Sequence, residues 1–273
     1  MKNKIFDCVT FFRENLITNL RFEILDKVVD YFIVCESLYD HKGNKKKINF
    51  KIKNNKFKKK IIHIIIKKKF STDNPWKAQA LQREYIFEGI KDAGHNDYIM
   101  FSDPDEIPDP VILKNFNLKK KYGIFMQTSF CYKFNLLNKY ETPWQGTRIC
   151  KKKDLKSIDY MRQKILLKNL KYPFWRIDKC KDIQIIKNGG WHFNNIFTPK
   201  DISIKLKTFA HTEFRNDKFS NIKVIKEKIN KKMDLYNRGW IFKKVKLNNS
   251  FPKYMVNKLY FRSIPRRFSD ITI

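Results

Sequence analysis

The stretch from Tyr98 to Pro110, which reads YIMFSDPDEIPDP, constrains the fold of this chain more than any other segment. Its first four residues are apolar and have the length and composition of a buried strand. Asp103, Asp105 and Glu106 follow in a loop whose prolines prevent regular structure from continuing through the acids. We therefore expect the three carboxylates at the carboxyl end of a strand. In open α/β sheets ligands bind at this edge, and clustered carboxylates suit Mg²⁺ or Mn²⁺ held together with the phosphates of a substrate.

The segments on either side of the acidic loop predict helices. Asn74 is a good N-cap for a helix that runs to about Ala93, where Gly94 ends it. A second helix is expected to begin at Asp109 and Pro110. A helix, a buried strand, a loop and a second helix in this order are typical of the βαβ units of a nucleotide-binding sheet.

The first half of the chain continues this pattern. Strands are expected over residues 5–12, 28–35 and 61–66, and a helix is expected over residues 15–27. Residues 41–60 are polar and lysine-rich, which predicts a loop. With 273 residues, the chain is long enough to bury a sizeable core.

The pattern changes after residue 122. Residues 123–130 and 132–137 form two strand-like runs with no room for a helix between them, so antiparallel or mixed pairing is expected. A turn is expected at the PWQGTR sequence around Trp144, and helices are expected over residues 202–209 and 222–240.

Two adjacent glycines, Gly189 and Gly190, precede Trp191 and His192. They predict a tight bend or a close approach of two backbone segments. The expected fold is α/β, with a nucleotide-binding sheet that is mixed in its second half and a helical C-terminal elaboration. We expect one domain over residues 1–240 and a basic, aromatic tail over residues 241–273.

The formal net charge is +32. Clustered lysines and arginines would suit nucleic acid or an anionic membrane. Here the excess is spread along the chain, from the lysines at 45–47 to those at 119–121 and the arginines at 266–267, which favours solvated surfaces. An anionic membrane is the first alternative and nucleic acid the second.

The cysteines and the start of the chain bear on location. Five cysteines without a CxxC spacing argue against a zinc knuckle or a disulfide framework and favour a reducing compartment. The start, MKNKIFDCVTFF, meets charged residues before an apolar stretch of signal-peptide length. We therefore expect a cytoplasmic protein.

Six ordered stretches carry a resemblance to a known family. They are DCVTFFRENLITNLRFEIL, VVDYFIVCES, REYIFEGI, YIMFSDPDEIP, GGWHF and KLKTFAHTEF. Together they resemble glycosyltransferase family 17 over about residues 5–235. The animal members of this family resemble the β-1,4-mannosyl-glycoprotein 4-β-N-acetylglucosaminyltransferase, which adds bisecting N-acetylglucosamine to N-glycans. The resemblance implies a GT-A-like, Rossmann-type sheet, a nucleotide-sugar donor such as UDP-GlcNAc, and an inverting transfer assisted by Mn²⁺ or Mg²⁺.

The resemblance also implies a metal site. Asp103 and Asp105 match the acidic motif of the family and would hold the ion that bridges the donor diphosphate, with Glu106 as a further ligand or a support. His192 or His211 would complete the ligand set, although each could instead be a structural histidine. A histidine ligand suits Mn²⁺ better than Mg²⁺.

Further roles follow for the donor, the acceptor and the proton transfer. Donor-binding roles fall to Glu36, Arg83 and Asp103, and acceptor-binding roles to Trp144, Arg148 and Trp191. An inverting transfer needs a carboxylate base, for which Glu213 is the first candidate, with Asp178 and Glu141 as alternatives. Each of these side chains could also be purely structural.

The expected cytoplasmic location and the basic surface put an N-glycan acceptor in doubt. We favour a lipid-linked or surface polysaccharide acceptor, with the enzyme held peripherally at the inner face of an anionic membrane. One rival is a metal-dependent nuclease or other phosphoryl-transfer enzyme. Another is a non-catalytic protein that binds carbohydrate or nucleic acid, in which the acidic loop is structural.

Overall fold

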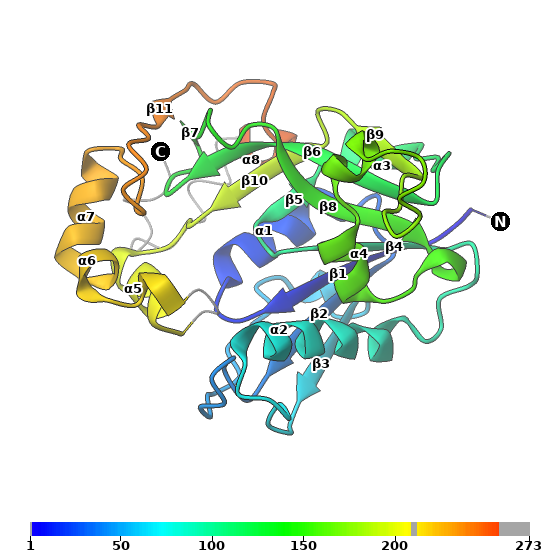
Figure 1. The fold of residues 1–273 in the computed structure, drawn as a ribbon, viewed down its shortest axis with the longest axis horizontal. Coiled ribbons are helices and arrows are strands. Elements are labelled where there is room, and N and C mark those ends of the chain that lie inside the picture. Colours follow the sequence, from blue (N-terminus) through cyan, green and yellow to red (C-terminus); the bar gives the residue numbers. More distant parts are fainter. Residues whose placement is uncertain (1, 209–211, 257–273) are drawn as a thin grey trace.

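A mixed sheet of eleven strands organises the structure, a computed structural model that describes residues 2–208 and 212–256 (Figure 1). The strands are β1 (Ile5–Phe11), β2 (Tyr31–Ser37), β3 (Ile61–Ile66), β4 (Tyr98–Ser102), β5 (Glu106–Pro108), β6 (Tyr122–Cys131), β7 (Leu136–Leu137), β8 (Trp144–Lys151), β9 (Ile183–Ile186), β10 (Gly190–Asn194) and β11 (Lys243–Lys244). The helices are α1 (Asn15–Leu25), α2 (Pro75–Glu84), α3 (Pro110–Lys114), α4 (Ile158–Lys164), α5 (Pro199–Thr208), α6 (Asp217–Ser220), α7 (Ile222–Asn230) and α8 (Lys253–Val256).

The sheet is parallel in the first half of the chain and mixed in the second. β3, β2, β1 and β4 lie side by side and all run in the same direction. β8 pairs antiparallel with both β4 and β6, and β6 pairs in parallel with β9 and β10. The predicted α/β class, with mixed pairing in the second half, is confirmed.

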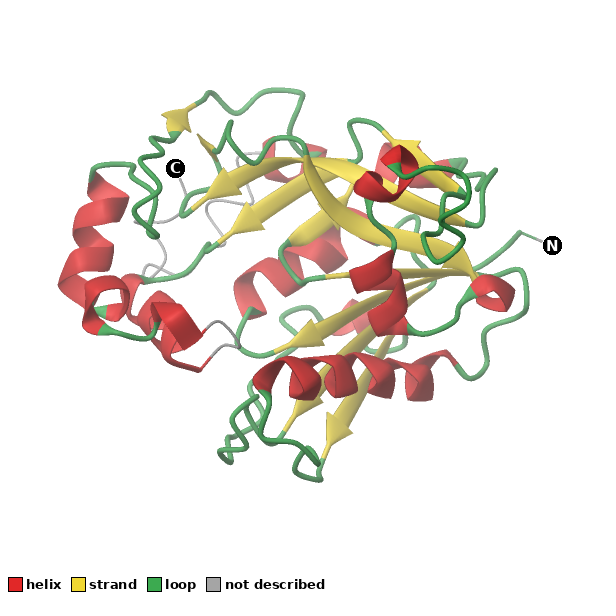
Figure 2. Ribbon diagram, viewed as in Figure 1, coloured by secondary structure: helices red, strands yellow, loops and turns green. Residues whose placement is uncertain are grey.

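Alternating residues of β1 face two separate hydrophobic cores, as the period of a strand requires. Val9 and Phe11 pack in the core that contains Leu20 of α1, whereas Phe6 packs with Ile86, which follows α2. Figure 2 shows α1 and α2 on opposite sides of these strands. Helices on both faces leave only the edges of the parallel strands open to ligands.

The start of α2 follows the predicted chemistry. The side chain of Asn74 accepts hydrogen bonds from the backbone amides of Trp76 and Lys77, and Pro75 occupies the first turn. The helix predicted to reach Ala93 changes at Tyr85 into a 3₁₀ helix that ends at Ile90. Tight helices of this kind are common at the ends of α-helices.

The turn predicted around Trp144 is wrong, because this segment begins the eight-residue strand β8. Gly146 lies where a Cβ atom would collide with the side chain of Gln127 on the neighbouring strand β6. A glycine inside a strand can mark such a close approach instead of a turn. The strand passes between β4 and β6 and links the two halves of the sheet.

Two other predicted elements are shorter than expected. Of residues 132–137, only Leu136 and Leu137 pair as a strand, because Tyr132 has a positive φ of 65° and turns the chain. The helix predicted over residues 222–240 ends at Asn230. Positive φ angles at Lys232 and at two later positions allow the chain to fold back on itself.

Residues after 240 pack against the same fold as far as the structure describes them. Phe242, Phe251 and Met255 are buried, and β11 pairs with β7. The boundary predicted at residue 240 stays a prediction, and residues 257–273 lie outside the described part. In the described residues no helix combines the length and hydrophobicity that a membrane span needs.

Arg21 and Asp7 form an ion pair inside the protein. Both side chains are enclosed, and Arg21 Nε and Nη2 each donate to a carboxylate oxygen of Asp7 at 2.6 Å. The same guanidinium donates to Ser102 Oγ at 2.9 Å and to the backbone carbonyl of Glu106. One side chain of α1 therefore joins β1, the end of β4 and the acidic loop.

Replacing Arg21 with methionine should lower the free energy of unfolding by about 3 to 5 kcal/mol, because Asp7 would remain as a buried charge without its partner. Urea denaturation would measure the effect. Lys231→Met is a matched control, because its pair with Glu227 is exposed and the substitution should change the free energy of unfolding far less. Equal effects of the two substitutions would contradict the role assigned to Arg21.

Candidate active site

A cavity of about 730 Å³ opens at the carboxyl ends of β1, β2 and β4. Its wall includes residues from the end of β1, the loop after β2, α2, the acidic loop, β8, α4, β10 and α5. The charged residues of the wall are Glu14, Asp40, Lys46, Arg83, Asp103, Asp105, Glu141, Arg148, Arg162 and Lys205. The acidic loop thus lies at the sheet edge where the sequence predicts it, in the wall of this cavity.

Arg162 holds two of the three acids of the loop. Its Nη2 lies 2.5 Å from Asp103 Oδ2 and 2.9 Å from Glu106 Oε1. Glu106 is fully buried and also accepts from the Trp144 indole at 2.7 Å and from the backbone amide of Asp103 at 3.2 Å. With Arg162 Nη1, which donates to Glu106 Oε2 at 3.2 Å, four donors point at this carboxylate. Glu106 therefore supports the loop and does not offer free oxygens to a ligand.

Asp105 and His192 face each other beside this group. His192 Nε2 lies 3.8 Å from Asp105 Oδ1, which is too far for a hydrogen bond. The Trp144 indole stacks on the imidazole, with ring centroids 4.6 Å apart and planes inclined by 20°. Ser129 Oγ lies 3.4 Å from His192 Nδ1 on the other side of the ring. The ring is therefore oriented with Nε2 toward the acid.

Burial shifts the pKa values of these groups. Burial lowers the pKa of His192 to about 4, so the ring is neutral near pH 7. Burial raises the pKa of Asp105 to about 7, against the opposing charge of Lys205 and together with the repulsion of Asp103. Burial also acts to raise the pKa of Asp103, but the positive charges of Arg162, Arg83 and Lys205 together hold that pKa below its usual range.

These residues fit a divalent cation through two donors. Two ligands that each bind one ion at about 2.1 Å lie roughly 3 to 4 Å apart, and Asp105 and His192 meet this condition. One oxygen of Asp103 is engaged by Arg162. Within residues 2–208 and 212–256, no group of three or more His, Cys, Asp or Glu side chains is arranged to hold a metal ion. His211 lies outside the described residues.

The two glycines before Trp191 bring β10 against the acidic loop. Gly190 has φ +126°, and a Cβ atom there would meet the carbonyl oxygen of Ile107 and lie 2.8 Å from Pro108 Cα. In the resulting antiparallel pairing, His192 lies opposite Glu106. The predicted close approach of two backbones is confirmed, and it is what places the histidine beside the acids.

Seven of the predicted site residues line the cavity: Arg83, Asp103, Asp105, Glu141, Trp144, Arg148 and His192. Both arginines among them are engaged by other groups of the protein. Arg83 Nη1 lies 2.7 Å from Asp159 Oδ1. The Arg148 guanidinium donates to the backbone carbonyls of Ile165, Gln145 and Gly146, so it holds the wall together.

Other predicted residues do not line the cavity. The donor-binding role of Glu36 stays a prediction, because this fully buried carboxylate lies off the cavity wall, where it accepts from the backbone amides of Asn49 and Phe50 and so closes the loop that follows β2. The acceptor-binding role of Trp191 also stays a prediction, and this residue is not part of the cavity wall. Its side chain alternates with that of His192 and points into the core on the opposite side of β10.

The predicted bases differ in position. Glu213 is exposed on a short 3₁₀ helix and is not part of the cavity wall, so its role stays a prediction. Asp178 is paired with Arg176 in an exposed loop outside the cavity. Glu141 is the one of the three that lines the cavity, and it accepts from Asn138 Nδ2 at 2.9 Å.

Sequence reasoning missed Arg162 and two exposed aromatic residues. Arg162 belongs to a basic stretch whose charges are expected to be solvated, and nothing in the pattern separates it from its neighbours. Trp76 and Tyr140 line the cavity with exposed fractions of 47 % and 45 %. An aromatic residue just inside an N-cap, as Trp76 is, was the available signal.

Comparisons with known proteins give one family match and several solved structures of low similarity. A sequence model described as glycosyltransferase family 17 matches residues 1–239. No curated protein matches the chain significantly. Three solved structures are similar, each covering 68 % of this chain. They are a 4-diphosphocytidyl-2C-methyl-D-erythritol synthase (9 % identity, TM-score 0.35, 89 % of that chain), a glycosyltransferase involved in glycosylation of the major capsid of PBCV-1 (11 %, 0.32, 82 %) and the inositol-1-phosphate CTP transferase of T. maritima (12 %, 0.30, 86 %).

Replacing Gly190 with alanine should lower the free energy of unfolding by about 2 to 4 kcal/mol, because a positive φ and a steric collision both oppose the new Cβ atom. Gly239→Ala is the matched control. Gly239 also has a positive φ, +78°, but its Cβ atom would meet no atom within 4 Å, so about 1 to 2 kcal/mol is expected. If urea denaturation gave the same loss for both, the close approach to Ile107 would not be what requires glycine.

Proposed function

Because the chain belongs to glycosyltransferase family 17, we propose that this glycosyltransferase moves N-acetylglucosamine from UDP-GlcNAc to a hydroxyl group of its acceptor, with inversion at the anomeric carbon. The observation that carries the proposal is the meeting of Asp105, His192 and the Asp103–Arg162 pair in one cavity at the carboxyl edge of the sheet. Carboxylates can hold a divalent ion, and such an ion together with fixed cations can stabilise the negative charge of a diphosphate leaving group.

The donor diphosphate would lie over the acidic loop. Arg162, Arg83 and Lys205 line the cavity around Asp103 and Asp105 and supply positive charge to a region that would hold phosphates. The predicted donor-binding roles of Arg83 and Asp103 are retained in this proposal. Arg162 would keep Asp103 ionised and would meet charge that develops as the nucleotide leaves.

The proposal includes a divalent ion, Mn²⁺ or Mg²⁺. Asp105 and His192 are the residues that would hold it, and a neutral imidazole with a carboxylate suits Mn²⁺ better than Mg²⁺. Such an ion would stabilise negative charge on the departing diphosphate. Trp144 and Ser129 would keep the His192 ring in the orientation that presents Nε2.

The nucleoside would fit the part of the cavity near the ends of β1 and β2. Tyr39, His41 and Gln82 line this part, and His41 Nε2 lies 2.8 Å from Gln82 Oε1. An aromatic ring and polar side chains of this kind can stack on and hydrogen-bond to a base.

The acceptor would enter on the side of β8. Trp144 has a predicted acceptor-binding role, but one face of its indole is covered by His192 and its N–H is donated to Glu106, so only the remaining face is available. Trp76 and Tyr140 are exposed aromatic residues of the same wall. Aromatic faces of this kind suit the apolar faces of sugar rings, and they join Arg148 as candidates for contact with the acceptor.

We retain a lipid-linked or polysaccharide acceptor, and a cytoplasmic enzyme with peripheral contact to an anionic membrane. The support is the net charge of +32 and the reducing compartment that the cysteines favour. Nucleic acid is a weaker candidate partner. Family membership also disfavours the nuclease and non-catalytic alternatives.

Replacing Asp105 with asparagine should reduce sugar transfer on the order of a hundredfold or more, because the variant would lose a ligand of the proposed ion. UDP-GlcNAc with Mn²⁺, at about 100 times its Kd, should stabilise the wild type by about 2.7 kcal/mol in thermal unfolding and the variant by much less. EDTA should remove the wild-type effect. Asp92→Asn, which changes an exposed acid outside the cavity, is the matched control. Equal stabilisation of all three proteins would exclude Asp105 from the donor site.

Glutamine at positions 141 and 213 should distinguish the two candidate bases. Loss of a general base lowers kcat by about a hundredfold to ten-thousandfold while donor binding persists. Glu141 lines the cavity, so we expect Glu141→Gln to show this pattern and Glu213→Gln to keep most of its activity. The reverse result would restore Glu213 as the base. Thermal stability of both variants controls for folding, since Glu141 also accepts from Arg238.

A further inference from the structure

Three large hydrophobic side chains project from the loop between α4 and β9. Phe174, Trp175 and Ile177 have exposed fractions of 84 %, 65 % and 94 %. Of the other large hydrophobic residues in the described chain, only Val111 is exposed by more than 60 %. Single exposed hydrophobic residues are ordinary, but three within four positions form a patch that calls for a partner.

The loop is held in a defined shape by its own contacts. We call residues 167–182 the docking loop. Asn169 is buried and donates to the carbonyls of Lys164 and Cys180, which closes the base of the loop. At the tip, the backbone amide of Arg176 donates to the carbonyl of Pro173, and its guanidinium makes two 2.8 Å contacts with Asp178. The hydrophobic side chains are therefore presented outward by a folded scaffold.

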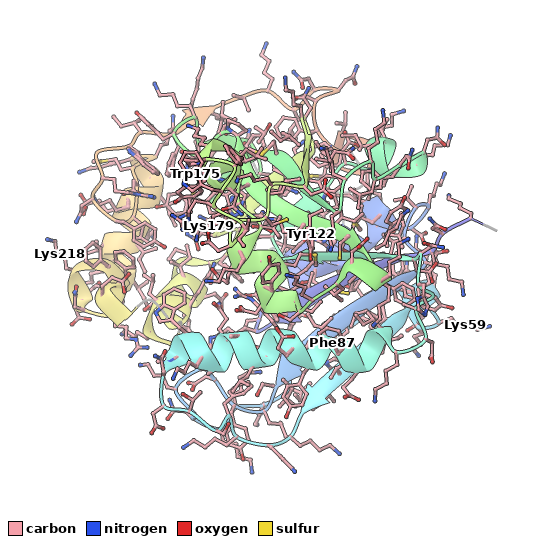
Figure 3. The ribbon with its side chains drawn as sticks, turned by 45° about the vertical axis from the view of Figure 1, so that its right-hand side comes forward. Lys59, Phe87, Tyr122, Trp175, Lys179 and Lys218 are labelled. Atoms are coloured by element: carbon pink, nitrogen blue, oxygen red, sulfur yellow. The ribbon has the colours of Figure 1, made fainter. Side chains whose placement is uncertain are left out.

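Basic residues flank this patch along the chain. Residues 164–182 contain six basic residues and two acidic ones. Lys168 and Lys171 are exposed, and Lys179, which Figure 3 labels together with Trp175, belongs to the same loop. The lysines at 119–121 adjoin the loop, since the amide of Lys121 donates to Asp182 and Lys120 Nζ lies 3.8 Å from the same carboxylate.

We propose that the docking loop attaches the enzyme to an anionic membrane, with Phe174, Trp175 and Ile177 entering the headgroup region. The inference rests on the proposed peripheral attachment and names the surface that makes it. Aromatic and aliphatic side chains flanked by lysines and arginines are the composition that binds at the interface of anionic bilayers. The basic residues supply charge complementarity to the lipid headgroups, and the projecting side chains supply insertion.

The position of the loop connects attachment to the cavity. Leu166, the residue before the loop, lines the cavity, and the amide of Leu167 donates to Gln145, which also lines it. The tip residues themselves are not part of the cavity wall. The docking loop therefore begins at the cavity wall, but its tip lies outside the cavity. A membrane bound at the tip would not occupy the donor site.

Flotation with phosphatidylcholine vesicles, with and without phosphatidylserine, tests the proposal. The full chain should float with the anionic vesicles and less so at high salt. The variant Phe174→Ser, Trp175→Ser, Ile177→Ser should bind on the order of tenfold or more weakly. The matched hydrophobic control is Val111→Ser with Ile241→Ser, two exposed residues elsewhere. For charge, Lys168→Glu with Lys171→Glu should weaken binding more than Lys218→Glu with Lys223→Glu, which changes exposed lysines on α6 and α7.

Each outcome decides the matter. Unchanged flotation of the triple serine variant, or no flotation of the wild type, would overturn the proposal. So would a concentration-dependent dimer in sedimentation that the triple variant abolishes without any vesicle binding, because the patch would then join two copies of the chain. Thermal unfolding with UDP-GlcNAc and Mn²⁺ separates this result from the proposed transfer. The triple variant should retain the donor-induced rise in unfolding temperature. If the wild type floated but showed no such rise, only the proposal about the donor would be contradicted.

Discussion

The ion pair between Arg21 and Asp7 is the constraint on which the site depends. Two buried charges cost free energy that only close, fully hydrogen-bonded geometry offsets, so α1 and β1 have little freedom to move apart. The same guanidinium binds Ser102 at the end of β4 and the carbonyl of Glu106. These contacts hold the backbone of the acidic loop in place without any contribution from a ligand.

A second arginine completes the loop from the side of the cavity. Arg162 forms ion pairs with Asp103 and Glu106, whereas Asp105 faces the neutral ring of His192. The three acids therefore lie in different electrostatic environments, although they are within four residues of one another in the sequence. Glu106 is saturated with donors, Asp103 is ionised by its partner, and Asp105 is destabilised as an anion by burial. A cation that reached Asp105 would relieve that burial cost, which is the physical reason to expect a ligand there and not at Glu106.

The sequence predicts those parts of this site that depend on local rules. The run before Asp103, the cap at Asn74 and the paired glycines at 189–190 each depend on neighbouring residues, and each is confirmed. The strand β8 is not predicted from the sequence, because its glycine indicates a turn unless the side chain of Gln127 is known to fill the space beside it. The place of Arg162 in the cavity wall and the absence of Glu36 from it depend on contacts between segments separated in sequence, which periodicity and capping do not report.

Charge and hydrophobicity would contribute differently to the proposed attachment of this surface to a membrane. A net charge of +32 spread over the chain gives attraction that has no direction and that salt screens, so by itself it would not orient the cavity toward a membrane. The loop after α4 adds a localised hydrophobic contribution at one point of that basic surface. Peripheral proteins attach stably when two such contributions act together, because insertion resists salt and charge accelerates encounter. Since the loop starts at the wall of the cavity, attachment there would fix the orientation of the acceptor side relative to the bilayer, which diffuse lysines could not do.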